Sequence, residues 1–302
     1  MKILKFFKKH KGIISNCLIV LVILILNYPI FADVWNAHHS SYMSSKYLDI
    51  VNSMDKKDYD SIIYDAEEYN YSLYNNPDRL KSEKTNPLYN NYLDINGTGI
   101  LAYITVPTAG VYNVPVYHGI DNAVLQIGAG HMPGSSLPSN AAGIHTVISG
   151  HSGMSGMKMF SQLPEVKVGD SFQVMYLNRV LFYTVVKIQT VLPSDSEPLK
   201  FDGGRNFCSL ITCTPLGINS HRLIVTGELE KTATVNNNSL MTRQTNTANL
   251  TIREYLEKRF ARYELIMSGF SILVFILFLI PDFIHYLIKK YRKRGERIEK
   301  NK

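Results

Sequence analysis

Two long apolar runs frame this chain, and short alternating segments fill most of what lies between them. Residues 13–31 (IISNCLIVLVILILNYPIF) and residues 266–288 (IMSGFSILVFILFLIPDFIHYLI) are each long enough to cross a bilayer as a helix. The alternative for the first run is a cleaved signal peptide, but no clear small-residue cleavage site follows it, which favours an uncleaved anchor. The alternative for the second run is a buried helix, and its charged flanks favour a membrane span. The pattern predicts two transmembrane helices.

Between these runs the apolar spacing changes from helical to strand-like near residue 99. Residues 40–76 carry apolar side chains at helical spacing without glycine or proline, which predicts an N-terminal helical extension. A polar segment with two Asn-Pro steps follows and predicts an extended loop. Beyond it lie seven short β-rich runs, ILAYITV, VPVYHG, GIHTVISG, SFQVMYL, VLFYTVVKIQTVL, FCSLITC and RLIVTGEL, with helical inserts at DNAVLQIGAG and MKMFSQLPEV. This order predicts a mainly β fold, a closed barrel or sandwich of seven or eight strands with short helices.

The same changes in pattern divide the chain into seven parts. We expect a basic tail (1–12), a transmembrane helix or signal anchor (13–31), the helical extension and its loop (32–98), a β domain (99–230), a polar linker with a juxtamembrane helix (231–265), a second transmembrane helix (266–288) and a second basic tail (289–302).

Charge assigns a direction to the two spans. The N-terminal tail carries +5 and the C-terminal tail +6, whereas the whole chain carries +7, so the residues between the tails carry a net −4. The basic balance therefore belongs to the tails and does not indicate a nucleic-acid surface. Positive flanks stay in the cytoplasm, so we expect a two-pass protein of the cell membrane with both termini inside and residues 32–265 outside.

The three cysteines do not form a disulfide framework. Cys17 lies in the first apolar run, and Cys208 and Cys213 lie on one strand-like segment. Their odd spacing directs the two side chains to opposite faces, which disfavours a bond between them. We expect Cys208 to be buried and inert.

Cys213 is the candidate nucleophile because it ends a predicted strand, where a rigid scaffold presents reactive atoms. Arg222 begins the return strand, and antiparallel pairing across the turn sets it beside Cys213. A permanent cation there favours a thiolate and stabilises a developing oxyanion. On these residues alone, a buried cysteine with an arginine at a rim is an equal alternative.

His151 ends another predicted strand and is the candidate acid and base. The other eight histidines have no comparable position, and we interpret them as surface or structural. There is no zinc signature, no phosphate-binding loop and no dinucleotide motif, so we expect neither a metal nor a cofactor.

The segments around these three residues resemble the sortases, the cysteine transpeptidases of Gram-positive bacterial surfaces. LITCTP is similar to their cysteine signature, SGHSG to their histidine segment and NSHRLIVTGE to their arginine strand. The similarity extends over roughly residues 60–230, and it is greatest to the pilin-polymerising class C. The resemblance implies a closed sortase-type barrel in which Cys213 attacks the threonine of an LPxTG-like sorting signal, His151 transfers protons and Arg222 stabilises the oxyanion. It also implies a lysine amine of a pilin as the acceptor.

One segment departs from the class C pattern. Class C sortases carry an Asp-Pro-aromatic loop over the active site, and the corresponding residues here are Asn86, Pro87 and Leu88. The carboxylate and the ring are both missing, so we expect a lid that is held more weakly. An ordinary proline-containing loop is the alternative. Ser152 also stands where class C usually has arginine.

Three other functions stay open at this point. A sortase that attaches surface proteins to cell-wall peptide would share the thiol chemistry and differ in the acceptor amine. A non-catalytic assembly module would not require Cys213, His151 and Arg222 together. An exported thiol oxidoreductase would require a bond between Cys208 and Cys213.

Overall fold

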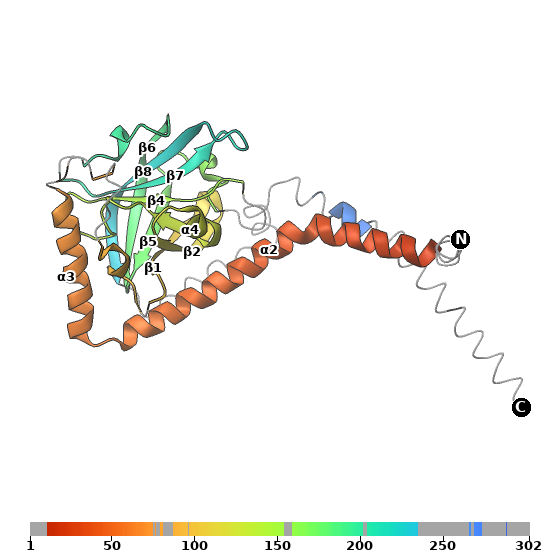
Figure 1. Cartoon of the computed structure of the whole chain (residues 1–302), viewed down its shortest axis with the longest axis horizontal. Helices are drawn as coiled ribbons and strands as arrows, with labels where there is room; N and C mark the ends of the chain where they lie inside the picture. The colour runs from red at the N-terminus through yellow and green to blue at the C-terminus, as the bar shows by residue number, and fades with distance from the viewer. Residues whose placement is uncertain are drawn as a thin grey trace, which may run out of the picture. The chain divides into compact units, whose positions relative to one another are not determined.

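The described part of the chain contains a β-barrel and two long helices. In this computed structural model, the residues described are 11–74, 76, 79–80, 87–95, 97–153, 159–201, 204–234, 266, 269–273 and 288. The chain divides into two compact units, residues 33–258 and residues 1–32 with 259–302, and each is described by itself. Figure 1 labels the barrel strands except β3, and the helices α2 (Lys11–Ser53) and α3 (Lys56–Leu73).

Eight strands form a closed barrel in the order β1-β2-β3-β4-β7-β8-β6-β5 (Figure 1). Their bounds are β1 (Ile100–Val106), β2 (Val111–His118), β3 (Ala129–His131), β4 (His145–Ser149), β5 (Ser171–Tyr176), β6 (Arg179–Val191), β7 (Phe207–Thr214) and β8 (His221–Thr234). Each of the seven predicted runs overlaps one of these strands. The prediction of a mainly β fold with a closed barrel is therefore confirmed.

Strand β3 is the one that the sequence pattern does not predict. Its first two residues are the last two of a segment expected to be helical, where helix α4 (Asn122–Ile127) ends after two turns. Asp121 caps this helix by accepting two backbone amides of the first turn, which starts the helix after β2. His118 and His131 end β2 and β3, so the expectation that these histidines lack a strand-end position is wrong.

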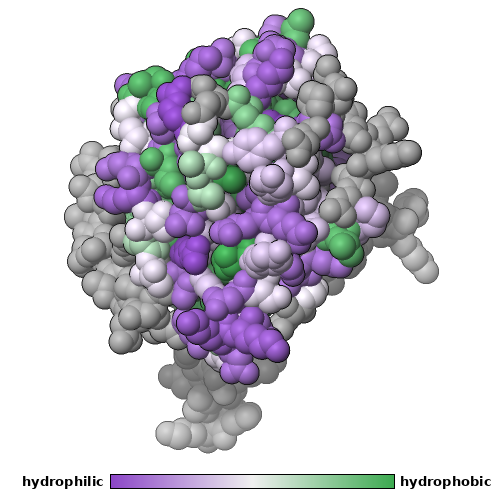
Figure 2. Space-filling model, turned by 90° about the vertical axis from the view of Figure 1, so that its left-hand side faces the viewer, coloured by the Kyte–Doolittle hydropathy of each residue, from purple (hydrophilic) through white to green (hydrophobic). Residues whose placement is uncertain are grey.

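Helix α3 and the second half of α2 confirm the predicted helical extension. Helix α3 buries one face, made of Ala66, Tyr69, Asn70 and Leu73. The Asn70 amide donates to the Leu137 carbonyl at 3.1 Å and accepts the Leu137 amide at 2.7 Å, which fixes the helix to the loop between β3 and β4. On the face that Figure 2 presents, hydrophilic side chains mix with scattered hydrophobic ones, as expected for helices that bury one face.

Among the described residues, no helix is both long and apolar enough to span a bilayer. Of the two segments predicted to do so, residues 13–31 lie within α2. Most of residues 266–288 lie outside the part of the chain that the structure describes.

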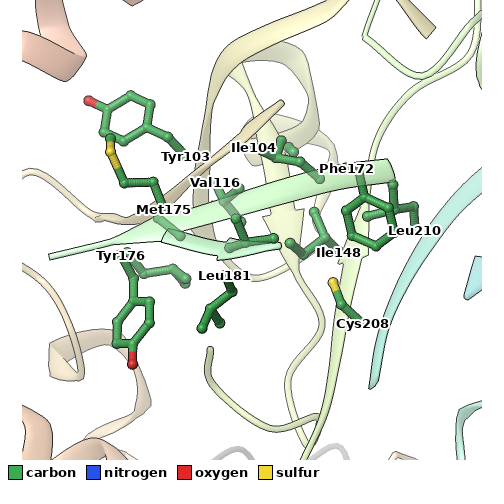
Figure 3. Close-up of a cluster of buried hydrophobic side chains, with 14 of the residues drawn as sticks. Tyr103, Ile104, Val116, Ile148, Phe172, Met175, Tyr176, Leu181, Cys208 and Leu210 are labelled. Carbon is green, nitrogen blue, oxygen red and sulfur yellow. The ribbon is translucent and has the colours of Figure 1, made fainter. Parts of the chain in front are cut away.

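The barrel interior contains one of the three cysteines. Figure 3 shows Cys208 among Ile148, Phe172 and Leu210 inside the barrel, and its side chain is fully buried. Burial in these apolar surroundings raises the pKa of the Cys208 thiol well above its ordinary value. Cys208 is therefore a neutral core residue, as its position in the strand predicts.

Tyr89 attaches the segment that follows α3 to the barrel. Its hydroxyl lies 2.7 Å from Nδ1 of His131 and 2.9 Å from the His131 carbonyl oxygen, while the Gly119 amide donates to it at 3.3 Å. Nε2 of His131 lies 2.9 Å from the Ser136 carbonyl, which can only accept, so the proton of the ring is on Nε2. This network buries a neutral histidine beneath the segment that carries Pro87 and Leu88.

Stability should fall as the pH falls below about 6.5, because His131 resists protonation in the folded state. Burial lowers the pKa of His131 from 6.5 to about 4, and burial also lowers the pKa of His118. Between pH 6.5 and pH 4 the unfolded chain then binds more protons than the folded one. The free energy of unfolding therefore falls, and the part due to His131 reaches about 3 kcal/mol at pH 4. Urea unfolding of the wild type at pH 7 and pH 4 measures this loss of stability.

A matched variant separates His131 from other acid-sensitive groups. His131→Gln retains a donor towards the Ser136 carbonyl and cannot titrate, so its stability should depend less on pH than that of the wild type. Equal pH dependence in the two proteins would contradict the assignment to His131.

Candidate active site

Neighbouring strands bring Cys213 and Arg222 together at one end of the barrel. Strands β7 and β8 are antiparallel, and their register sets Cys213 directly opposite Arg222. The connection between the strands is residues 215–220, a tight turn in which the amides of Ile218 and Asn219 donate to the Pro215 carbonyl. The turn predicted from the sequence therefore gives the expected pairing.

His151 reaches the same place from strand β4, which pairs with β7 in parallel. Ser149 is level with Ile211 in this register, and the Gly150 amide donates to the Ile211 carbonyl at 3.0 Å. Thr212 continues the contact by donating its hydroxyl to the Gly150 carbonyl at 2.8 Å. Extending the register by two residues sets His151 beside Cys213, so an imidazole, a thiol and a guanidinium lie in one row across β4, β7 and β8.

The backbone around His151 is held by close packing. A Cβ atom at Gly150 would lie 2.7 Å from the ring of Phe160, so a residue other than glycine would displace that ring or His151. The Phe160 amide also donates to the His151 carbonyl at 3.0 Å. Gly153 has a φ of +79°, and a Cβ atom there would lie 2.6 Å from Leu216 of the turn after Cys213. The loops that follow the thiol and the imidazole therefore touch.

The guanidinium of Arg222 is oriented by its own turn. Its Nη1 donates to the Asn219 carbonyl at 3.2 Å and to the His221 carbonyl at 3.1 Å. These bonds leave other N–H groups of the planar guanidinium to bind a ligand, since arginine has five donors. Arg222, His151 and Cys213 are all partly exposed, so a substrate can reach the row.

An apolar patch lies next to this row on the outer face of the same three strands. It consists of buried side chains from β4, β7 and β8 with one from the β6–β7 connection: Val147, Ile211, Ile224 and Leu199. Leu80, Met132 and Val191 pack against it. A chain of polar side chains, Thr226, Ser209 and His145, lies beyond Val147 on this face.

The sequence analysis missed Thr212 and this polar chain. Alternation along residues 207–213 already separates Cys208 and Leu210, which face inward, from Ser209, Ile211 and Cys213, which face outward. The sequence pattern therefore shows which residues of β7 share the outer face. It does not show which strands lie beside β7.

The predicted lid is described in part. Asn86 lies outside the described residues, Pro87 is exposed, and Leu88 is 56% exposed at the start of a short 3-10 helix, η1 (Tyr89–Asn91). The buried anchor of this segment is Tyr89, the residue after the three that the sequence singled out. The covering role of Asn86, Pro87 and Leu88 stays a prediction.

Metal binding was searched for over the described residues alone. There, no group of three or more histidine, cysteine, aspartate or glutamate side chains is arranged to hold a metal ion.

Comparison with known proteins identifies the family. A family model described as a sortase domain matches residues 104–230. The chain is 38% identical to sortase C1 from Streptococcus agalactiae, over 62% of this chain and 96% of that one, with a TM-score of 0.55. It is 36% identical to sortase C from Streptococcus pneumoniae, over 63% and 97% of the two chains, with a TM-score of 0.56.

Two further relatives differ in the class that their names give. A pilus-related sortase C of Group B Streptococcus is 31% identical over 60% of this chain and 93% of that one, with a TM-score of 0.54. A curated sequence, sortase A of Streptococcus agalactiae serotype III (strain NEM316), is 27% identical over 218 residues, which are 71% of this chain and 82% of that protein.

The matched region runs from β1 into β8 and so includes every strand of the row. The sortase C structures are matched over nearly their whole length at more than 30% identity. The chain therefore belongs to the sortase family and is a cysteine transpeptidase whose structural relatives are class C sortases.

Proposed function

We propose that this sortase joins pilin subunits through a thioester on Cys213. The observation that carries the proposal is the register of β4, β7 and β8: it pairs Cys213 with Arg222 and, extended by two residues beyond Ser149, aligns His151 with Cys213. A thiol between an acid–base group and a permanent cation is the arrangement that acyl transfer needs.

Each residue has one role in the first half of the reaction. The Cys213 thiolate attacks the threonine carbonyl of an LPxTG-like signal, and Arg222 stabilises the negative charge that develops on the carbonyl oxygen. His151, as imidazolium, gives its proton to the leaving amine as the threonine–glycine bond breaks. The products are a thioester on Cys213 and the released C-terminal fragment.

The second half reverses these proton transfers. The neutral amine of a pilin lysine attacks the thioester, His151 takes a proton from that amine, and the thiolate of Cys213 leaves. One amide bond is broken and one is formed, so the exchange conserves the acyl energy and needs no nucleotide. This suits an enzyme that acts outside the cytoplasm.

The choice of a pilin lysine rests on the relatives. The Streptococcus pneumoniae sortase C is described in terms of pilin substrate specificity, and the Group B Streptococcus relative is pilus-related. Attachment of surface proteins to cell-wall peptide is the second candidate, and the similarity to a protein named sortase A favours it. The thioester is common to both, and the acceptor amine distinguishes them.

The location and the lid belong to the same proposal. The basic tails at 1–12 and 289–302 stay in the cytoplasm, residues 13–31 and 266–288 anchor the chain, and the barrel acts on the extracytoplasmic side. The segment of Asn86, Pro87 and Leu88 covers the thiol between reactions and opens for substrate. Protease treatment of intact cells tests the location, because a barrel outside the membrane is digested and both tails are protected.

Intact mass spectrometry of the full chain with an LPxTG-type peptide tests the transpeptidase chemistry. We expect a mass gain equal to the acyl half of the peptide. Adding a pilin peptide with its lysine, or a cell-wall peptide with its free amine, should discharge the enzyme, and the product identifies the acceptor. Discharge by the cell-wall peptide alone would replace pilin joining with anchoring, and no acyl-enzyme with any sorting peptide would contradict the proposed roles.

A further inference from the structure

His145 connects the barrel to the segment between β6 and β7. Its ring is buried, with 2% of the residue exposed. Nδ1 lies 2.8 Å from the Lys200 carbonyl, and Nε2 lies 2.8 Å from the Ser209 hydroxyl. The sequence analysis assigned this histidine no function, and the proposed mechanism does not use it.

The hydrogen bonds of His145 have a defined direction. A carbonyl can only accept, so Nδ1 carries the proton and donates to Lys200, and Nε2 accepts the Ser209 hydroxyl. The Ser209 oxygen in turn lies 2.8 Å from the Thr226 hydroxyl. A chain of three bonds thus runs from β8 through β7 and β4 to the backbone of Lys200.

The segment held at Lys200 forms one wall of the apolar patch beside Cys213. Leu199 is 4% exposed and belongs to the cluster with Ile211 and Ile224, and these two are level with Ser149 in the row next to the thiol. The position of the Leu199 side chain therefore depends on where the backbone of residues 199–201 is held.

A second set of contacts holds the same segment to the chain that precedes the lid. Arg79 donates to the Leu199 carbonyl at 3.0 Å and to the Gly134 carbonyl at 2.7 Å, and its guanidinium lies 3.8 Å from the centre of the Phe201 ring. Tyr74 stacks on Phe201 at 4.9 Å. The segment is thus fixed between the barrel and the chain that precedes the lid, with His145 as its hydrogen-bonded contact to the barrel.

We propose that His145 is a positioning residue for the transfer reaction: its Nδ1–H bond to Lys200 holds Leu199 as the wall of the apolar patch that binds an apolar side chain of the sorting signal. The proposal rests on the proposed function, because it concerns the same peptide substrate. Leu80 of the upstream segment packs on this patch, so the patch already binds an aliphatic side chain. The apolar side chain of the substrate takes the position of the Leu80 side chain. His145 never touches the reacting atoms.

Two substitutions of His145 separate the Lys200 bond from the rest of the ring. His145→Asn places an amide N–H near the position of Nδ1 and retains the donor to Lys200, whereas His145→Gln reaches towards Ser209 and lacks that donor. Loss of one hydrogen bond predicts that KM for an LPxTG-type peptide rises about 3- to 10-fold in His145→Gln, with kcat within about twofold. His145→Asn should stay near the wild-type KM.

Controls in the full chain distinguish positioning from general support of the fold. Thr226→Val breaks the far end of the hydrogen-bond chain, so it should lower the unfolding temperature and leave KM unchanged. The reaction of Cys213 with a small thiol reagent should have the wild-type rate in His145→Gln. Leu199→Ala removes the wall itself and should raise KM, a result that is available even if His145→Gln does not fold.

Each outcome decides one of the two proposals. Failure of the wild type to form a thioester would overturn the proposed function. A wild type that acylates, with KM unchanged in His145→Gln or in Leu199→Ala, would overturn the positioning role alone. An equal rise of KM in His145→Asn and His145→Gln would also overturn it, because the donor to Lys200 would then be irrelevant.

Discussion

Replacing Cys213 with alanine is expected to abolish thioester formation and to lower the rate of sorting-peptide cleavage by at least about 10⁴-fold. Cys213 is the partly exposed thiol in the row with His151 and Arg222. Without its sulfur no covalent intermediate forms, and water has no comparable position from which to attack the carbonyl. The remaining oxyanion contact and peptide binding account for the residual rate.

Cys208→Ala is the matched control for this loss. Both variants remove one sulfur from the same strand, but Cys208 lies inside the barrel beside Phe172 and Leu210 (Figure 3). The small cavity should destabilise the fold by about 1 kcal/mol and leave cleavage within about twofold of the wild-type rate. Initial rates and intact masses of the three proteins measure cleavage and acylation, and urea unfolding measures the destabilisation. Acylation of Cys213→Ala, or its loss in Cys208→Ala, would contradict the assignment of the nucleophile.

The pairing of Cys213 with Arg222 could be predicted because it is local. A short turn between two alternating segments fixes an antiparallel register, and that register was found. The place of His151 could not be derived in the same way. It depends on β4 lying parallel to β7 in the closed barrel, and the apolar period of either strand carries no information on its neighbour. Resemblance to a family supplied what periodicity could not.

Strand β3 shows the limit of pattern reasoning in the fold. Ala129, Gly130 and His131 include no β-branched residue and are too few to show alternation. Their extended conformation comes from pairing with β2 on one side and β4 on the other. Gly130 is required there, since a Cβ atom would lie 2.2 Å from the Gly119 carbonyl oxygen.

The same limit explains why the sequence singled out residues 86–88 of the upstream segment and missed others. Leu88 was considered because it occupies the position of the aromatic residue in the Asp-Pro-aromatic loop of class C sortases. Tyr89 and Arg79 are the described anchors of that segment, and their partners, His131 and the Leu199 carbonyl, are distant in sequence. Contacts of this kind depend on the barrel order, so only the structure reveals them.

Arg222→Ala should lower kcat/KM for the sorting peptide by about 10²- to 10³-fold, the effect of removing one donor from an oxyanion site. The structure orients this guanidinium before substrate arrives, through its bonds to the Asn219 and His221 carbonyls. A charge that is already positioned stabilises the tetrahedral intermediate without the cost of ordering a long side chain. The loss should therefore be expressed mainly in kcat.

Arg222→Lys tests whether charge or geometry matters more. Lysine keeps the positive charge, but its ammonium cannot bond both turn carbonyls and the substrate oxygen in one plane, so we expect a loss of about 10- to 10²-fold. The rate at which a small thiol reagent labels Cys213 is measured beside kcat in all three proteins. A fall in labelling as large as the fall in kcat would mean that Arg222 acts on the thiolate, whereas unchanged labelling with reduced kcat assigns it to the oxyanion. Full activity of Arg222→Ala would exclude both roles. Arg222 would then serve only to hold the turn between β7 and β8.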